Sequence, residues 1–288
     1  MPSTSASSEY GTLLAVAMRY AQEFDRELDG PDVHPVLARQ KATSRWEPHD
    51  PATARAQQDA LIKILTDRGV TVILLGAVPG CSTQHYPRDL GFVIDELFFT
   101  ARLNSDHRLP ELDALAHLPG VLTPDSRLDA GTIEGGDVML HIDTVLVGLS
   151  EETSPEGVAA LRRALERTGV ERDVVPVAFN TDGIVHLDDH FNIIAPNLAL
   201  VHRSVFPKTQ LSYFEQHFDM IEVTDDEALA VQTNVLAIAP DTVVVAAGST
   251  RLAMQLRRRG IAVIEVDYSE VTRLPGSLRC STLPLRRA

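Results

Sequence analysis

The sequence predicts an α/β protein whose repeated ββαβ units close into a single five-bladed, pseudo-symmetric α/β propeller. Two observations predict it: hairpin signals recur along the chain, and helical segments followed by a strand lie between them. The hairpins start near residues 89, 137, 184 and 234, about 48 residues apart. The alternative is an ordinary α/β sandwich with accidental spacing. We favour the repeat because both the order of the elements and their spacing recur.

Each expected hairpin consists of two short apolar or β-branched runs around turn residues. The first unit should begin near residues 12–17, and the later hairpins cover residues 90–100, 138–148, 184–203 and 234–248. Turn residues separate the runs, as with Asp95-Glu96 in the first of these hairpins and Pro240-Asp241 in the last. These segments therefore supply the first two strands of their units.

Amphipathic segments that end at a glycine follow the hairpins. In the segment 155–168, apolar residues recur on one helical face, and Gly169 stands where a C-cap belongs. Similar helices are expected over residues 52–68 and 249–259. The strands after the helices are expected over residues 70–75, 174–178, 220–223 and 261–266.

Composition places the chain among ordinary globular proteins and limits its partners. Residues 1–8 are expected to be a disordered tail and residues 9–288 a single domain. The formal charge of −14 argues against nucleic acid and anionic membranes as partners, because both need a basic face. Two cysteines are too few for a disulfide scaffold, and we find neither a signal peptide nor an apolar run of about 20 residues. We expect a cytoplasmic protein.

The two cysteines offer one candidate nucleophile. Cys280 lies in Gly-Ser-Leu-Arg-Cys-Ser-Thr, between a Pro-Gly turn and a short apolar strand. A thiol is useful as a nucleophile only where it can become a thiolate. A cysteine taken alone is more often a small buried apolar residue, and we interpret Cys81 in that way.

Polar clusters stand at the start of three hairpins. His186 and Asp188 are predicted on one face of a strand, where a carboxylate can orient an imidazole for proton transfer. Glu134-Gly135-Gly136-Asp137 and Tyr86-Pro87-Arg88-Asp89 open two other hairpins, and the two glycines permit a close backbone approach or positive φ. Each cluster alone could be a solvated loop. In a closed ring, however, these hairpin ends would converge around one thiol and one imidazole.

Other chemistries find little support in the sequence. Metal motifs such as Cys-x-x-Cys and His-Glu-x-x-His are missing from it, as are nucleotide-binding glycine loops. We therefore expect no metal and no cofactor. A papain-like protease would also use cysteine and histidine, but the flanking residues differ, and the additional acids would have no role in peptide cleavage.

The combination of motifs resembles the guanidine-modifying superfamily, also called the penteins. Its members include arginine deiminases, dimethylarginine dimethylaminohydrolases and amidinotransferases. The resemblance extends from about residue 9 to residue 287. The residues that carry it are Arg88-Asp89, Glu134-Gly135-Gly136-Asp137, Gly148-Leu149-Ser150, His186-Leu187-Asp188 and Cys280. The resemblance implies a five-bladed propeller of ββαβ units, in agreement with the repeat.

The resemblance also implies roles for these residues. The Cys280 thiolate would attack the guanidinium carbon, and His186 would shuttle protons with Glu134 as its partner. Asp89 and Asp188 would hold the guanidinium nitrogens, since a planar cation with several N–H donors suits carboxylates in its plane. Relatives carry a stacking aromatic residue three positions before the first acid, where this chain has Tyr86.

One motif departs from the family pattern. Relatives usually have Gly-x-Ser-x-Arg-Thr after the second hairpin, and that arginine often binds a substrate carboxylate. This chain has Glu152 in its place, and an anion there should weaken carboxylate binding. We therefore expect a substrate tail that lacks a carboxylate or carries an amine. Arg108 lies near the position of a second carboxylate-binding arginine in relatives, which leaves arginine itself open as a substrate.

The resemblance favours a hydrolase that acts on the guanidinium group of arginine or an arginine-like compound. It would pass through a covalent thiouronium intermediate and release ammonia or an alkylamine. An amidinotransferase that passes the amidino group to an amine is the second hypothesis. A non-catalytic pentein that binds a macromolecule is the third. The expected partner is a small cationic guanidino substrate, and a homodimer is compatible with this interpretation.

Overall fold

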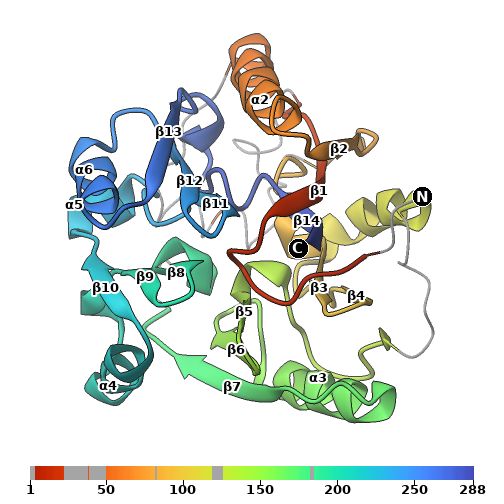
Figure 1. Ribbon diagram of the computed structural model, residues 1–288. Helices are drawn as coiled ribbons and strands as arrows, with labels where there is room; N and C mark the ends of the chain where they lie inside the picture. Colours follow the sequence, from red (N-terminus) through yellow and green to blue (C-terminus); the bar gives the residue numbers. More distant parts are fainter. Residues whose placement is uncertain (1–3, 23–37, 39–49, 82, 119–125, 182–184) are drawn as a thin grey trace.

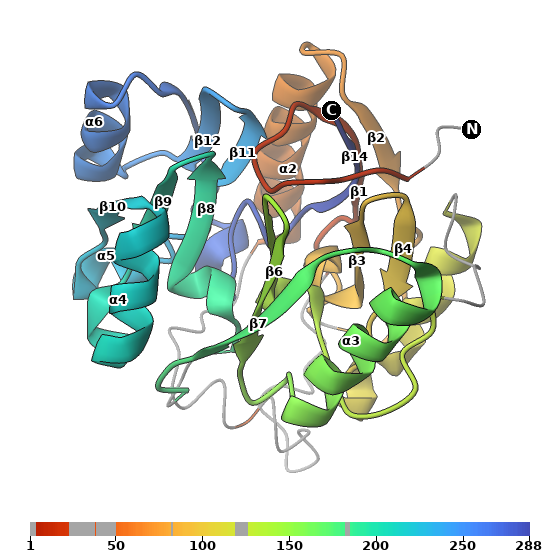
Figure 2. The same cartoon turned by 60° about the horizontal axis from the view of Figure 1, so that its bottom comes forward.

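Small β-sheets arranged around a common centre form the framework of the protein (Figure 1). This computed structural model describes residues 4–22, 38, 50–81, 83–118, 126–181 and 185–288, and within them the strands form five separate sheets. Helices lie outside the sheets, as Figure 2 shows for α3, α4 and α6. The α/β class is thus confirmed. Strand pairing occurs only within each sheet of the described residues, so the closed five-bladed propeller stays a prediction.

Three sheets repeat the predicted ββαβ order. Each has an antiparallel hairpin, an α-helix and a third strand parallel to the second. The first is β5 (Val138–His141), β6 (Thr144–Leu149), α3 (Pro155–Thr168) and β7 (Asp173–Ala178). The next is β8 (Phe191–Ala195), β9 (Leu198–Val201), α4 (Lys208–His217) and β10 (Asp219–Glu222). After α5 (Asp225–Leu229) comes β11 (Leu236–Ala239), β12 (Thr242–Ala246), α6 (Thr250–Arg258) and β13 (Ala262–Val266).

The chain termini build a fourth sheet together. β1 (Leu13–Met18) and β2 (Thr71–Leu74) pair in parallel and are connected through α2 (Pro51–Thr66). The missing antiparallel strand comes from the opposite end of the chain, because β14 (Leu283–Arg287) pairs with β1. The C-terminal strand therefore lies against the N-terminal one, where the blue and red ribbons meet in Figure 1. This pairing holds the segment before β14 at the centre of the molecule.

The remaining sheet departs from the repeat. It consists of the hairpin β3 (Gly91–Ile94) and β4 (Leu97–Thr100), and the described residues add no third strand to it. A 3₁₀ helix, η3 (Asp106–His117), follows this hairpin in place of an α-helix. Pro110 lies inside it, and a proline there removes a donor that an α-helix would need.

Local sequence explains where the helices begin and end. The side chain of Ser154 accepts a hydrogen bond from the backbone N–H of Gly157, and Pro155 occupies the first turn, where its missing N–H costs nothing. Gly169 ends α3 with φ of 70°, a left-handed conformation that glycine adopts readily. The predicted bounds of this helix are confirmed.

The strands nearest the centre are buried on both faces. In β5, Val138 packs in one hydrophobic cluster with Phe92 of β3, while Met139 packs in another with Phe191 of β8. Successive strand residues point to opposite faces, so each hairpin is held between its two neighbours. This arrangement explains why the strands are continuous apolar runs rather than alternating ones.

The N-terminal residues differ from the sequence prediction of a tail over residues 1–8. Residues 1–3 lie outside the described residues, but Ala6 is only 4% exposed and bridges to Asp95. The backbone N–H of Ser5 also donates to the carbonyl of Leu285. Backbone hydrogen bonding and apolar burial therefore fix residues 4–8, which the composition alone does not reveal. Among the described helices, none combines the length and the apolarity needed to cross a membrane.

Candidate active site

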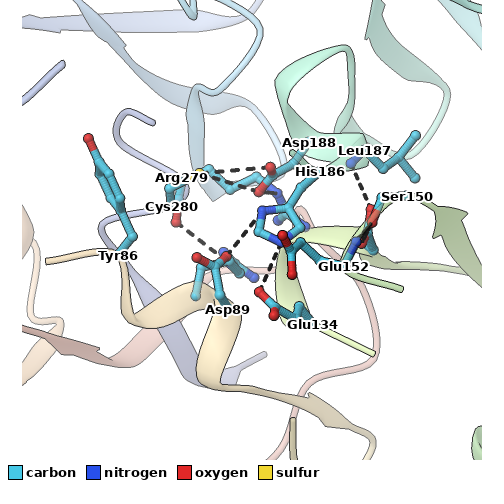
Figure 3. Close-up of polar contacts among 12 residues, drawn as sticks. Tyr86, Asp89, Glu134, Ser150, Glu152, His186, Leu187, Asp188, Arg279 and Cys280 are labelled. Atoms are coloured by element: carbon cyan, nitrogen blue, oxygen red, sulfur yellow. Dashed lines mark hydrogen bonds and ion pairs between the residues drawn. The ribbon is translucent and has the colours of Figure 1, made fainter. Parts of the chain in front are cut away.

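The polar side chains at the centre come from equivalent places in the fold. Each lies just before a strand at the end of its sheet: Asp89 before β3, Glu134 before β5, His186 before β8, Asn234 before β11 and Cys280 before β14. These end strands lie toward the centre in Figure 1. Segments far apart in the sequence therefore meet, as Figure 3 shows. The predicted convergence of the hairpin ends is found.

His186 lies between two acids. Its Nε2 is 3.1 Å from Oε2 of Glu134, and its Nδ1 is 3.5 Å from Oδ1 of Asp89. Burial disfavours the charged ring, but the negative charges of Asp89, Glu134 and Asp137 outweigh it and raise the pKa of His186 well above 6.5. These surroundings therefore favour the protonated imidazole.

The backbone around His186 differs from the prediction. We expected His186 to start a strand, but it precedes the 3₁₀ helix η6 (Leu187–Asp189), and β8 begins only at Phe191. The carboxylate of Asp137 explains the turn, since its Oδ1 accepts from the N–H of Leu187 at 2.8 Å and its Oδ2 from the hydroxyl of Ser150 at 2.6 Å. Asp137 thus fixes the segment that carries the imidazole.

Cys280 faces an amide and an acid. Nδ2 of Asn234 donates to Sγ at 2.9 Å, and both carboxylate oxygens of Asp188 lie 3.8 Å from Sγ. Burial raises the pKa of Cys280 well above 9, and Asp188, Asp189 and Asp89 raise it further, against the opposing hydrogen bond from Asn234. Without a cationic ligand, the surroundings of the sulfur therefore favour the neutral thiol.

Asn234 was not among the residues singled out from the sequence, although a signal for it exists. Residue 234 was placed at the start of a hairpin, the same position that Asp89 and Glu134 occupy in their units. Its Oδ1 also accepts from the backbone N–H of Cys280 at 3.0 Å. The repeat therefore marks the residue that positions the thiol.

Asp188 is enclosed beneath the sulfur. It is fully buried, and its Oδ2 is 3.1 Å from Nε of Arg279. Arg279 in turn pairs with Glu9 and donates from Nη2 to the carbonyl of Val138 at 3.0 Å. The sequence analysis assigned no role to Arg279 or Glu9. Together they compensate a carboxylate that would otherwise be costly to bury beside the thiol.

Arg108 is engaged by protein groups. Its Nη1 donates to Oδ2 of Asp89 at 2.7 Å, and its Nε and Nη2 donate to the carboxylate of Glu111 at 2.9 and 3.2 Å. Nη2 also reaches the carbonyl of Tyr86 at 3.1 Å. Glu111 and Asp89 hold the pKa of Arg108 well above its usual value in spite of burial. The arginine therefore orients Asp89, and most of its donors are occupied.

A cavity of about 40 Å³ joins these groups. The residues that line it are Thr83, Tyr86, Asp89, Ser105, His107, Arg108, Glu134, Glu152, Val185, His186, Asp189, Leu274, Pro275 and Cys280. The predicted thiol, imidazole and acids thus share one cavity, with the exception of Asp188, which lies behind the sulfur. Asp189, which the sequence analysis did not select, is part of the lining.

Glu152 brings a further acid to the cavity wall. It is 3% exposed, and its Oε2 accepts a long hydrogen bond of 3.4 Å from the hydroxyl of Ser105. Burial raises the pKa of Glu152, and the charge of Glu134 raises it further. Position 152, which departs from the family pattern, therefore brings a carboxyl group close to Glu134, the acid that partners His186 (Figure 3).

The two adjacent glycines allow the acids and the imidazole to meet. A Cβ on Gly136 would lie 2.7 Å from two ring atoms of His186, and a Cβ on Gly135 would lie 2.1 Å from the carbonyl oxygen of Arg88. Of the two explanations offered by the sequence, the structure favours close approach over positive φ, because neither residue has positive φ.

Tyr86 lines the cavity, but its hydroxyl points away from it in Figure 3. The hydroxyl lies 2.7 Å from the carbonyl of Leu274, and the carbonyls of Val271 and Gly276 are 3.0 and 3.2 Å away. The ring therefore fastens the segment before Cys280 to the segment that carries Asp89. Stacking on a substrate cation stays a prediction.

Two groups of side chains have the donor types of a metal site. In one group, atoms of Asp89, Glu134 and His186 all lie within 4.8 Å of one another; in the other, atoms of Asp188, Asp189 and Cys280 do. The same groups are also arranged as a proton-transfer set, with His186 between Asp89 and Glu134, and as an acidic set around the sulfur, with Cys280 facing Asp188.

Comparison with known proteins places this chain among guanidine-modifying enzymes. A family model described as "N,N dimethylarginine dimethylhydrolase, eukaryotic" matches residues 38–287. An uncharacterised protein, YkgA, of Bacillus subtilis is 34% identical over 238 residues, which cover 82% of this chain and 81% of that protein. The N(G),N(G)-dimethylarginine dimethylaminohydrolase of Pseudomonas aeruginosa is 28% identical over 243 residues, covering 81% and 89% of the two chains.

A solved structure gives the same fold. An amidinotransferase of Microseira wollei from saxitoxin biosynthesis superposes with a TM-score of 0.79 at 19% identity, over 99% of this chain and 97% of that one. At that identity the likeness concerns the fold alone. The family match covers most of the chain and agrees with the motifs around the cavity. The chain therefore belongs to the N,N-dimethylarginine dimethylhydrolase family, and with it to the guanidine-modifying superfamily.

Proposed function

We propose that this protein is a hydrolase of small guanidino compounds in which Cys280 is the nucleophile. One observation carries the proposal. The Cys280 thiol and the protonated His186, the latter held between Asp89 and Glu134, face one small acidic cavity. The dimethylarginine dimethylaminohydrolases among the relatives support the reaction class.

The cavity is suited to a planar cation. An alkylguanidinium has several N–H donors in one plane, and carboxylates are their best partners. Oδ1 of Asp89 is buried and makes no hydrogen bond, although Nδ1 of His186 lies 3.5 Å from it, so it can accept from such a donor. Asp188, below the sulfur, supplies negative charge from the opposite direction. A cation between them would lower the pKa of the thiol, because it offsets the acids that now raise it.

The first half of the reaction forms a covalent intermediate. The thiol of Cys280 releases its proton to solvent as the cation binds, and the thiolate attacks the guanidinium carbon to form a C–S bond. The C–N bond to the leaving nitrogen then breaks, with a proton from His186 converting that nitrogen to ammonia or an amine. The intermediate is a cationic thiouronium, and its positive charge remains between the same acids.

Water completes the cycle. The neutral imidazole of His186 takes one proton from a water molecule that attacks the thiouronium carbon. The C–S bond breaks, and the second proton of the water returns to the sulfur. A urea-type product leaves, with thiol and imidazolium restored. Glu134 acts here as a positioning residue, since its Oε2 lies 3.1 Å from the Nε2 of His186.

The remaining part of the proposal concerns the substrate tail. Glu152 contributes a carboxyl group to the wall of the cavity, and most donors of Arg108 are occupied by Asp89, Glu111 and Tyr86. Among the described lining residues, this arrangement disfavours an anionic tail. We therefore infer a substrate tail that is neutral or carries an amine. This agrees with the expectation from the sequence, in which Glu152 stands in place of the arginine of the family pattern.

A substrate panel tests the function. Arginine, N-methylated arginines, agmatine and neutral alkylguanidines are compared by kcat/KM, with urea-type product and released amine measured separately. Turnover that yields a urea-type product in the absence of any amine acceptor supports the hydrolase. Product that forms only with an added amine would instead indicate an amidinotransferase, and no turnover of any guanidino compound would contradict both.

The tail is tested with a charge reversal. In Glu152→Arg, the ratio of kcat/KM for arginine to that for agmatine should rise about tenfold or more, because a carboxylate gains a cationic partner. Glu151→Arg is the matched control, since the neighbouring Glu151 is exposed. A strong preference of the unmodified protein for arginine would contradict the inference about the tail.

The proposal includes the organisation of the whole molecule. We infer that the five sheets are the blades of a closed propeller, with Cys280 near its axis. The order of the sheets around the centre in Figure 1 supports this view. We further infer that residues 9–288 act as one catalytic domain. A crystal structure of the full chain would test the arrangement.

A further inference from the structure

Asp189 is a partly buried acid in the cavity that the proposed reaction does not use. Its Oδ1 is shielded from solvent and has no hydrogen-bond partner. The residue lines the cavity, and one of its carboxylate oxygens lies within 4.8 Å of both Sγ of Cys280 and a carboxylate oxygen of Asp188. An unpartnered buried carboxyl oxygen is costly and calls for an explanation. The missing partner is best supplied by a ligand that occupies the cavity.

The acids around the sulfur offer more hydrogen-bond acceptors than the N–H donors of a dimethylated guanidinium can fill. An alkylguanidinium with unsubstituted terminal nitrogens has five N–H donors, whereas N,N-dimethylation of one terminal nitrogen leaves three. Oδ1 of Asp189 has no hydrogen-bond partner in this region, Oδ1 of Asp89 has only the ion pair with His186 at 3.5 Å, and Asp188 lies below the sulfur. Glu134 is engaged with His186 on the side of the leaving group. A ligand with more donors leaves fewer of these oxygens unsatisfied.

We propose that Asp189 accepts a hydrogen bond from a terminal N–H of the substrate guanidinium and thereby selects guanidino compounds without N-methyl groups. This inference rests on the proposed function and specifies its substrate class. It separates the chain from the dimethylated substrate that the description of its family names.

The cost of leaving a buried acceptor unpaired supports the proposed selection against N-methylated guanidino compounds. A site built to bind a substrate N–H discriminates strongly against an analogue that lacks it, because the buried acceptor is left unpaired. Burial, with the charge of Asp188, raises the pKa of Asp189 to about 8, so an incoming cation would favour its charged, accepting form.

The experiment uses guanidinium ions that have no tail, so that the tail does not affect the result. Chloroacetamidine, a small amidinium alkylating agent, labels Cys280, and site-resolved mass spectrometry gives the rate. Guanidinium and 1,1-dimethylguanidinium at millimolar concentrations compete with the label, which gives an inhibition constant for each. For the unmodified protein, guanidinium should bind about tenfold or more tightly than its dimethyl analogue.

Substitution of Asp189 should remove this preference. In Asp189→Ala, guanidinium should bind about tenfold more weakly, and the ratio of the two constants should fall below about threefold. Asp189→Asn keeps an acceptor oxygen and should retain part of the ratio. Asp226→Ala, at an exposed position in α5, is the matched control and should behave as the unmodified protein. Thermal unfolding of each variant shows that the fold is retained.

Several outcomes would overturn the inference. Equal binding of the two ions to the unmodified protein, or an unchanged ratio in Asp189→Ala, contradicts the role of Asp189 while leaving a guanidino hydrolase intact. Failure of both ions to protect Cys280 in the unmodified protein, together with no turnover in the substrate panel, would contradict the proposed function itself.

Discussion

Acidic neighbours have opposite effects on the charged forms of the reactive side chains at the two sides of the cavity. On one side, Asp89 and Glu134 stabilise the positive charge of His186 and raise its pKa. On the other, burial and then Asp188 destabilise the negative charge of the Cys280 thiolate and raise its pKa. The carboxylates therefore favour the protonated imidazole, which is the general acid, but disfavour the thiolate, which is the nucleophile. The site therefore lacks one positive charge, which a guanidinium can supply.

The largest expected effect comes from removing the sulfur. Cys280→Ala should lower kcat for the best guanidino substrate by at least about 10⁴-fold, because the covalent path is lost. The acids remain, so a guanidinium ligand should still bind, which isothermal titration calorimetry can measure. Retained turnover in this variant would contradict the assignment of the nucleophile.

Removing the imidazole tests the opposite side of the cavity. His186→Asn should lower kcat by about 10²- to 10⁴-fold, since proton transfer to the leaving nitrogen is lost. At the same time guanidinium should bind more tightly, because a cation beside Asp89 has been removed. A split of this kind, with lower kcat and tighter binding, would not arise from mere unfolding. If binding weakened instead, the imidazole would not be cationic in the empty site.

The raised pKa of the Cys280 thiol predicts how the rate of its alkylation depends on pH. Because the pKa of Cys280 lies well above 9, the thiolate fraction should rise about tenfold per pH unit from pH 6 to pH 9. Alkylation of Cys280 by the neutral reagent iodoacetamide, measured by mass spectrometry apart from Cys81, should follow that slope without a plateau. A plateau below pH 8 would mean that the thiol is already activated without a ligand.

The smallest expected effect concerns Asn234. Its amide donates to Sγ and so opposes the acids, which means that Asn234→Ala should raise the pKa of the thiol further. We expect alkylation of Cys280 at pH 8 to slow by about tenfold. Asn197→Ala, at an exposed turn between β8 and β9, is the matched control. An unchanged rate would show that the amide does not tune the sulfur.

Short-range signals explain what the sequence predicted well. The hairpins, the bounds of α3 and the position of Gly169 follow from turn residues, caps and apolar periodicity, all local properties. Regular spacing also indicated that Asp89, Glu134 and His186 occupy equivalent places. The strand expected at His186 was wrong, because the distant carboxylate of Asp137 stabilises a 3₁₀ turn there.

The repeated units, the α/β class and the kinds of side chain available for chemistry follow from the sequence alone. The partners of these side chains depend on the packing of the whole chain: β14 returns to pair with β1, Asn234 reaches the sulfur, and Asp188 lies beneath it while Asp189 lines the cavity. This is because hydrogen bonds and charge interactions act over a few ångströms, whatever the separation along the chain. Local patterns specify each element, but the packing of distant elements sets the protonation of the thiol and the imidazole.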